Sequence, residues 1–100
     1  MSDLAERFEA DLWDTIREAK AIGYSPTIFE RMLNDHGGVK TAKKLIVSGD
    51  VQSGFERLAK LGRLDISMER KMLKPEYTSL FTRDELRASE WRLAQVAGAP

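Results

Sequence analysis

The chain has 100 residues, of which 42% are hydrophobic and 32% are charged, a balance typical of a folded domain rather than of a disordered chain. It contains no cysteine, which excludes disulfides, thiolate zinc sites and a cysteine nucleophile. No apolar run is long enough to span a membrane, and the acidic, amphipathic start is unlike a signal peptide, so we expect a cytoplasmic protein without a membrane partner.

The net charge of zero conceals an uneven distribution of charge along the chain. Residues 1–36 carry four positive and eight negative side chains, a balance of −4. Residues 37–74 carry nine positive and four negative side chains, a balance of +5. A basic middle segment of this size is compatible with binding a polyanion but does not require it.

The first part of the chain predicts a long helix followed by two short ones. Residues 1–22 form the long N-terminal helix, with an inward stripe at three- and four-residue steps: Leu4, Phe8, Leu12, Ile16 and Ala19. Residues 24–97 then form the helical core. Its first helix should start with Ser25 as N-cap and Pro26 at the first helical position, and should end at Gly37 and Gly38. The next helix is short, and its apolar residues are Val39, Ala42, Leu45 and Ile46.

The second part predicts a turn around Ser48-Gly49-Asp50 and further short helices. The helix after this turn should bury Val51, Phe55, Leu58 and Leu61. In GRLDIS, the turn that follows, we expect Arg63 to satisfy either backbone carbonyls or a carboxylate. Asp65 or Ser67 should cap a short helix that ends before Pro75. One helical turn is expected in EYTSLF.

The last predicted helix begins at Thr82, which forms a capping box with Glu85. Its inward-facing residues should be Leu86, Leu93 and either Trp91 or the residues that flank it, Ser89–Leu93. No segment alternates apolar and polar residues as a half-buried strand does. The sequence therefore predicts an all-α fold, a compact single domain over residues 1–100 with about six short helices and the long N-terminal helix packed on the bundle.

Three patterns that suggest chemistry do not withstand inspection. Asp50 with Glu69-Arg70-Lys71 imitates a metal-dependent nuclease, but residues two apart on a helix face different directions. His36 is the single histidine and lies where an imidazole complements a helix end. The segment GGVKT lacks the spacing of a phosphate loop. We therefore predict no catalytic residue, no metal site, no cofactor and no enzymatic activity.

Two binding functions remain open from the residues. Short helices with balanced charge leave grooves that suit a protein partner. Alternatively, helices over Thr41–Ser48 and Gln52–Lys60 resemble a helix-turn-helix in length, with nucleic acid held by the basic middle segment, whose candidate residues are Lys40, Lys43, Lys44, Arg57, Lys60 and Arg63.

Much of the chain also resembles a known group of proteins. The segments GYSPTIFERMLNDHGGVKTAKKLI, SGFERLAKLGRLDISME and LKPEYTSLFTRDEL are similar to a widespread family of small bacterial proteins. Members share an H-G-G motif, a G-R-L-D-L-[ST]-x-E motif and an L-F-T-x-x-E motif. The resemblance implies a stand-alone protein of unassigned activity, with a link to mobile-element or defence contexts. Arg70 and Lys71 depart from the more apolar residues of the family at these places.

The polar positions of that shared pattern suggest a network formed by His36, Arg63, Asp65 and Glu69. If the fold brings them together, they form either a buried ion-pair network or a ligand site. We thus expect a small non-enzymatic interaction module that binds an unidentified protein, with nucleic-acid binding as the alternative. The oligomeric state does not follow from the sequence.

Overall fold

The structure is a computed structural model that describes residues 3–47 and 53–97. Over these residues the chain forms six α-helices and two short 3-10 helices, with no strand. The all-α prediction and the long first helix are confirmed. In chain order the elements are α1 (Leu4–Ala21), α2 (Thr27–His36), α3 (Gly38–Ile46), α4 (Ser53–Lys60), η1 (Leu64–Ile66), α5 (Met68–Met72), η2 (Thr78–Leu80) and α6 (Arg83–Ala97).

Helix α1 follows the predicted pattern closely. Asp3 caps it, because its Oδ1 accepts a hydrogen bond from the backbone N–H of Glu6 at 2.8 Å. The buried stripe runs from Phe8 to Ala19 and faces the other helices. The helix gives way to a turn at Gly23, whose φ of 90° is a conformation that only glycine adopts without strain.

The start of α2 differs from the prediction. The helix begins at Thr27, and Pro26 occupies the N-cap position without a side-chain hydrogen bond. Ser25 does not cap, because the chain turns before the helix, where the Ser25 carbonyl accepts the N–H of Thr27 at 2.9 Å. The predicted Ser25 cap is therefore wrong.

The H-G-G motif joins α2 to α3, and its two glycines have separate physical roles. Gly37 ends α2 with a φ of 82°, the left-handed region that favours glycine. Gly38 allows α3 to lie directly against α1, since a Cβ atom at this position would stand 2.7 Å from Glu9 Cα. The Glu9 carboxylate then accepts a hydrogen bond from the Gly38 N–H at 3.2 Å and supplies negative charge at the start of α3.

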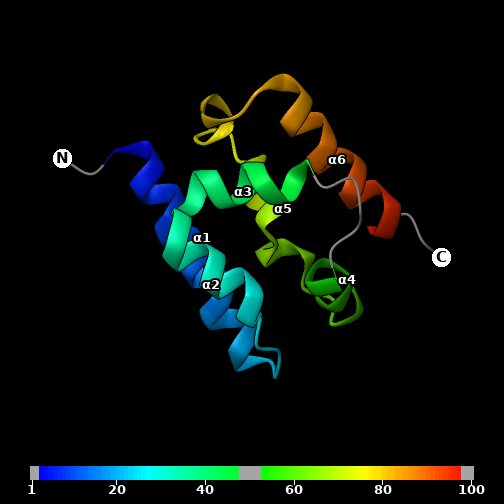
Figure 1. Cartoon of the computed structure of the whole chain (residues 1–100). Coiled ribbons are helices and arrows are strands. Elements are labelled where there is room, and N and C mark those ends of the chain that lie inside the picture. The colour runs from blue at the N-terminus through cyan, green and yellow to red at the C-terminus, as the bar shows by residue number, and fades with distance from the viewer. Residues whose placement is uncertain (1–2, 48–52, 98–100) are drawn as a thin grey trace.

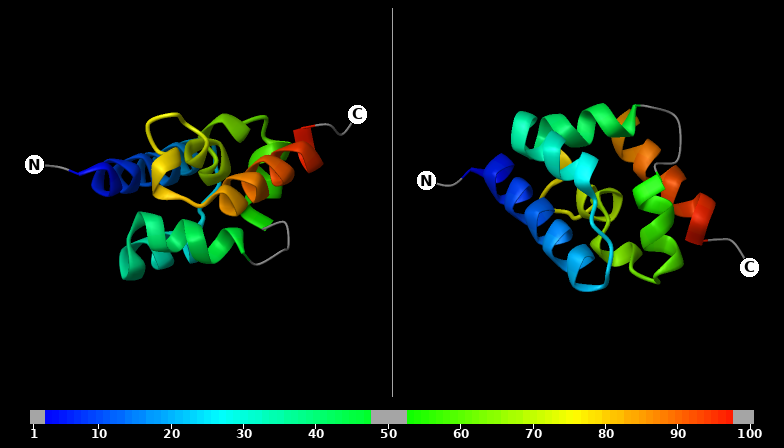
Figure 2. Two further views of the ribbon diagram at one scale, coloured as in Figure 1. Left: turned by 90° about the horizontal axis from the view of Figure 1, so that it is seen from above. Right: turned by 60° about the horizontal axis from the view of Figure 1, so that its bottom comes forward.

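Helix α5 occupies the centre of the fold and is surrounded by the other helices (Figure 2, right). It packs against both α1 and α6. Two charged side chains tie it in opposite directions: Glu69 pairs with Arg92 of α6, and Lys71 donates to the Asp11 carbonyl of α1 at 2.5 Å. Residues two apart on this helix thus face different ways, as the sequence predicts for Glu69 and Lys71.

The main core lies between α1, α2, α3 and α5, and Leu86 and Ala88 of α6 pack against it. It consists of Phe8, Leu12, Ile16, Leu33, Ala42, Ile46, Met68, Met72, Tyr77 and Phe81. Phe8 makes edge-to-face contacts with Tyr77 and Phe81, with ring centroids 5.3 and 5.2 Å apart, a favoured aromatic geometry. A smaller cluster, formed by Ala19, Leu58 and Ile66, fixes α4 and η1 against the end of α1.

The C-terminal helix carries the predicted capping box. Glu85 N–H donates to Thr82 Oγ1 at 3.1 Å, and Thr82 N–H donates back to Glu85 Oε1 at 2.8 Å. Of the two inward faces expected for this helix, the one with Trp91 is wrong, because 53% of its surface is exposed, whereas Ser89 and Leu93 are buried. The buried face of α6 instead runs through Ser89 and Arg92, and the pairing of Arg92 with α5 turns Trp91 outward.

Two further predictions from the middle of the chain have different outcomes. Leu61 is 39% exposed rather than buried, because it follows the end of α4 at the turn that contains Gly62. The turn around Ser48-Gly49-Asp50 and the predicted inward position of Val51 lie outside the described residues.

A candidate binding pocket between α2 and α4

A pocket of about 330 Å³ lies between α2 and α4, the two helices on opposite sides of the lower half of Figure 1. Its floor comes from α1 and α5, through Ala19 and Met68. Phe29 of α2 and Phe55 of α4 contribute aromatic surface to its walls, and Leu45 of α3 adds a further apolar contact. Most of the lining is apolar, which is usual for sites that bind small molecules or single side chains.

The rim of the pocket is formed by Ile28, Tyr24 and the start of α4. Ile28 lines the pocket although 75% of its surface is exposed, so the pocket opens to solvent beside a protruding apolar side chain. The Tyr24 ring is half-buried beneath Arg57, whose guanidinium carbon lies 5.9 Å from the ring centroid. Burial raises the pKa of the Tyr24 hydroxyl, although Arg57 lowers it.

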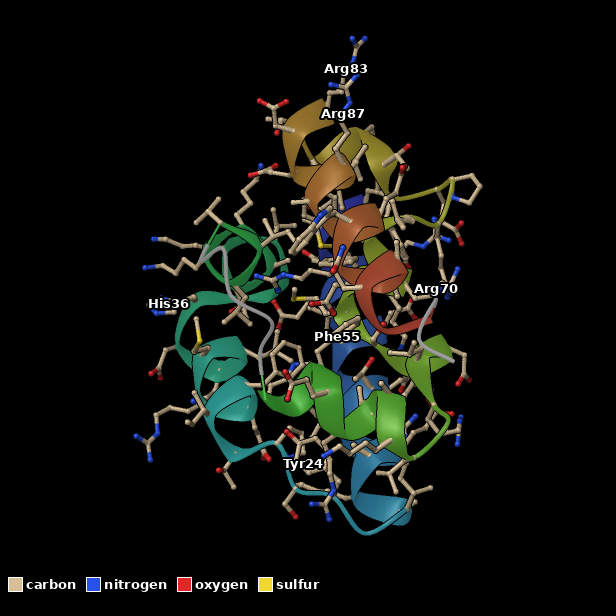
Figure 3. All side chains as sticks on the ribbon, turned by 90° about the vertical axis from the view of Figure 1, so that its right-hand side faces the viewer. Tyr24, His36, Phe55, Arg70, Arg83 and Arg87 are labelled. Atoms are coloured by element: carbon tan, nitrogen blue, oxygen red, sulfur yellow. The ribbon has the colours of Figure 1, made fainter. Side chains whose placement is uncertain are left out.

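Gly54 determines how far the Tyr24 hydroxyl reaches toward α4. A Cβ atom at position 54 would lie 2.5 Å from the Tyr24 oxygen, so any larger residue would displace that side chain. Tyr24 therefore meets Gly54 and Phe55 of α4 at this pocket. Figure 3 shows Tyr24 and Phe55 near α4, whereas Arg83 and Arg87 lie at the far end of the molecule.

The floor of the pocket contains a buried ion pair. Glu69 lines the pocket and accepts a hydrogen bond from Arg92 Nη1 through its Oε2 at 3.0 Å. The side chains are only 4% and 2% exposed. Burial raises the pKa of Glu69, and the Arg92 guanidinium opposes that rise. Arg92 Nη2 also donates to the Leu45 carbonyl at 2.5 Å, in the last turn of α3, where the backbone N–H of Val47 donates to the same oxygen.

The predicted polar network is not one cluster. Arg63 and Asp65 do lie together, with Arg63 Nε 3.0 Å and Nη2 3.2 Å from the two carboxylate oxygens. Asp65 is exposed, and the paired guanidinium lowers the pKa of its carboxyl. Glu69 instead faces Arg92, and His36 is exposed at the end of α2. The prediction of a single four-residue network is therefore wrong.

The cap in the GRLDIS turn belongs to Ser67 rather than Asp65. Ser67 Oγ accepts the Arg70 N–H at 3.1 Å and donates to the Leu64 carbonyl at 2.7 Å. The Arg63–Asp65 pair lies on the outside of the turn, where water weakens ion pairs. The turn is thus pinned by the buried Ser67 and by Ile66 in the smaller cluster.

The predicted nucleic-acid-binding residues differ in their availability. Four of them are exposed: Lys40 and Lys44 on α3, and Arg57 and Lys60 on α4. Lys43 pairs with Glu85 at 2.7 Å and lies 5.6 Å from the centroid of the Phe81 ring, and Arg63 pairs with Asp65. The first four are therefore the residues that remain available to phosphates.

The helix-turn-helix hypothesis concerns α3, α4 and the segment between them. That segment includes residues 48–52, which lie outside the described residues. Helix α3 packs mainly against α1, α2 and α6, whereas α4 packs mainly against η1 and α6. The geometry of a helix-turn-helix pair therefore stays a prediction.

Some structural residues were not identified from the sequence. Arg92 and Lys71 are both buried, and each ties two helices together. Tyr77 donates its O–H to Asp11 Oδ2 at 2.6 Å, and Glu9 holds the start of α3. The sequence holds a weak signal for Arg92, because it lies three residues after Ser89 and next to Leu93, on the same face of α6, and all three are buried.

Within residues 3–47 and 53–97, no three His, Asp or Glu side chains are arranged to hold a metal ion. In the same part of the chain, no helix combines the length and the apolar character needed to cross a bilayer. Comparison of the chain with protein-family models, with curated proteins and with solved structures finds no match.

Proposed function

We propose that this protein is a small non-enzymatic interaction module that binds a protein partner through the pocket between α2 and α4. One observation carries the proposal: an apolar pocket of about 330 Å³ opens beside Ile28, which is 75% exposed. An exposed apolar side chain next to an apolar hollow loses contact with water when a partner covers both. A volume of this size suits one bulky side chain, which is how partners commonly anchor to grooves.

The experiment is affinity capture from a lysate of the native host with three forms of the protein. Ile28→Glu places a charge at the rim of the pocket without disturbing the core. Val47→Glu is the matched control, because Val47 is also β-branched and 72% exposed but does not line the pocket. The proposal expects one or more proteins to bind the parent and the Val47 variant and to be lost from the Ile28 variant. Equal capture by all three forms would contradict it.

Nucleic-acid binding is the second candidate, favoured by the exposure of Lys40, Lys44, Arg57 and Lys60. If about four phosphates are neutralised, the logarithm of the affinity should fall with the logarithm of salt at a slope near −3.6. A gel shift at low salt, with duplex and single-stranded probes, tests this function. The absence of a complex with either probe would exclude it.

A further inference from the structure

Together, three of the five helices that line the pocket carry an excess of positive charge. Over their described residues, α2, α3 and α4 contain six Lys and Arg side chains and three Asp and Glu side chains, a balance of +3. One of the three acids, Glu30, is already paired with Lys20 of α1 at 2.9 Å. Lys43 of α3 is likewise paired, with Glu85 at 2.7 Å. The remaining excess of positive charge on these three helices favours an acidic partner over a basic one.

The positive charge reaches the rim of the pocket at Arg57. Its guanidinium lies above the Tyr24 ring, and Tyr24 itself lines the pocket. Lys60 follows one turn later on the same helix and is exposed. An apolar group that enters the pocket beside Tyr24 thus brings its neighbours close to the cations of α4.

The chemistry of the pocket favours an apolar side chain over the sugar-phosphate backbone of a nucleic acid. Apolar side chains dominate the lining, and the charged group that lines it, Glu69, is negative and held by Arg92. Neither a phosphate nor a sugar gains from entering such a site, whereas a leucine, phenylalanine or tryptophan side chain does. Positive charge around an apolar hollow is the complement of an acidic helix with one apolar face.

We infer that the partner presents an amphipathic, acidic helix, which inserts a bulky apolar side chain into the pocket and places Asp or Glu residues against Arg57 and Lys60. This inference rests on the proposed function and specifies the class of partner. The contact with Arg57 is at the rim, so it contributes modestly to affinity and more strongly to its salt dependence.

A displayed peptide library tests the inference without assuming a partner sequence. The library keeps a helical scaffold and varies both the apolar positions and the charge of the flanking positions. It is selected on the parent protein and depleted on the Ile28→Glu variant. The inference expects the enriched peptides to share a bulky apolar anchor and a net negative charge.

The strongest enriched peptide is then measured against two variants by fluorescence anisotropy at several salt concentrations. Arg57→Gln should weaken binding about threefold at low salt and reduce its salt dependence, as the loss of an exposed ion pair does. Arg83→Gln is the control, since Arg83 lies at the opposite end of the molecule from Tyr24 (Figure 3).

The possible results separate the inference from the proposed function. Enrichment of apolar anchors without negative charge would overturn the acidic partner and leave the pocket as the binding site. Equal effects of the Arg57 and Arg83 variants would also overturn it. A library without any enrichment, together with affinity capture that does not depend on Ile28, would overturn both. If an oligonucleotide binds more tightly than every selected peptide, the basic surface would be a nucleic-acid-binding surface, and the acidic helical partner would be overturned.

Discussion

Removal of either partner of the Glu69–Arg92 pair should strongly destabilise the protein. The pair is almost completely buried, and Arg92 also ties α6 to α3 through the Leu45 carbonyl. A buried charge that loses its partner costs about 3–5 kcal/mol, a large part of the 5–15 kcal/mol that stabilises a typical domain. Glu69→Met and Arg92→Met should each lower the free energy of unfolding by about that amount.

The double variant distinguishes a lost charge pair from a packing defect. With both charges replaced by methionine, no buried charge remains and most of the loss should be recovered. A deficit of about 1 kcal/mol should persist, because the Leu45 carbonyl loses the hydrogen bond from Arg92. Urea unfolding followed by circular dichroism measures all three variants. The reasoning is refuted if the single variants unfold within about 1 kcal/mol of the parent, or if the double variant is no more stable than the worse single variant.

Three further perturbations follow from the same structure. Gly38→Ala should cost about 1–3 kcal/mol in urea unfolding, because its Cβ would meet the Glu9 backbone, and an unchanged midpoint would contradict that close approach. Ser67→Ala should cost about 0.5–2 kcal/mol through loss of the cap, while Asp65→Ala melts like the parent; the reverse order would restore Asp65 as the cap. Burial and a hydrogen bond to a carboxylate raise the pKa of Tyr77 to about 12, so tyrosinate absorbance should show a late step that Tyr77→Phe removes. Because the folded state holds this proton more tightly, the stability it provides is present below pH 10 and lost as the pH rises toward 12.

The elements that the sequence predicts well are those set by local chemistry. A capping box needs only residues three apart, as at Thr82 and Glu85, and a positive φ needs only a glycine, as at Gly37. The stripe on α1 likewise depends on spacing within one helix. These signals act over one or two turns, so they can be interpreted without knowledge of the fold.

Which buried charges pair, and which face of α6 packs against the core, both depend on residues that are far apart in the sequence. Glu69 and Arg92 are 23 positions apart, and Lys71 reaches a carbonyl 60 positions away. No local pattern distinguishes the buried Glu69 and Lys71 from Arg70, which lies between them in the sequence and is exposed. Trp91 was expected inward because it is large and apolar, but the buried Arg92 next to it determines which face of the helix packs. The pocket is likewise formed by five helices and has no signature in any one of them.

The central claim is that the pocket between α2 and α4 is the binding surface. Its most direct test is a nuclear magnetic resonance titration of the isotope-labelled protein with the selected peptide. The account predicts that the largest shifts occur at residues lining the pocket, among them Ala19, Tyr24 and Phe55. Shifts concentrated at Lys40 and Lys44 on the exposed side of α3, with the pocket residues unchanged, would contradict it.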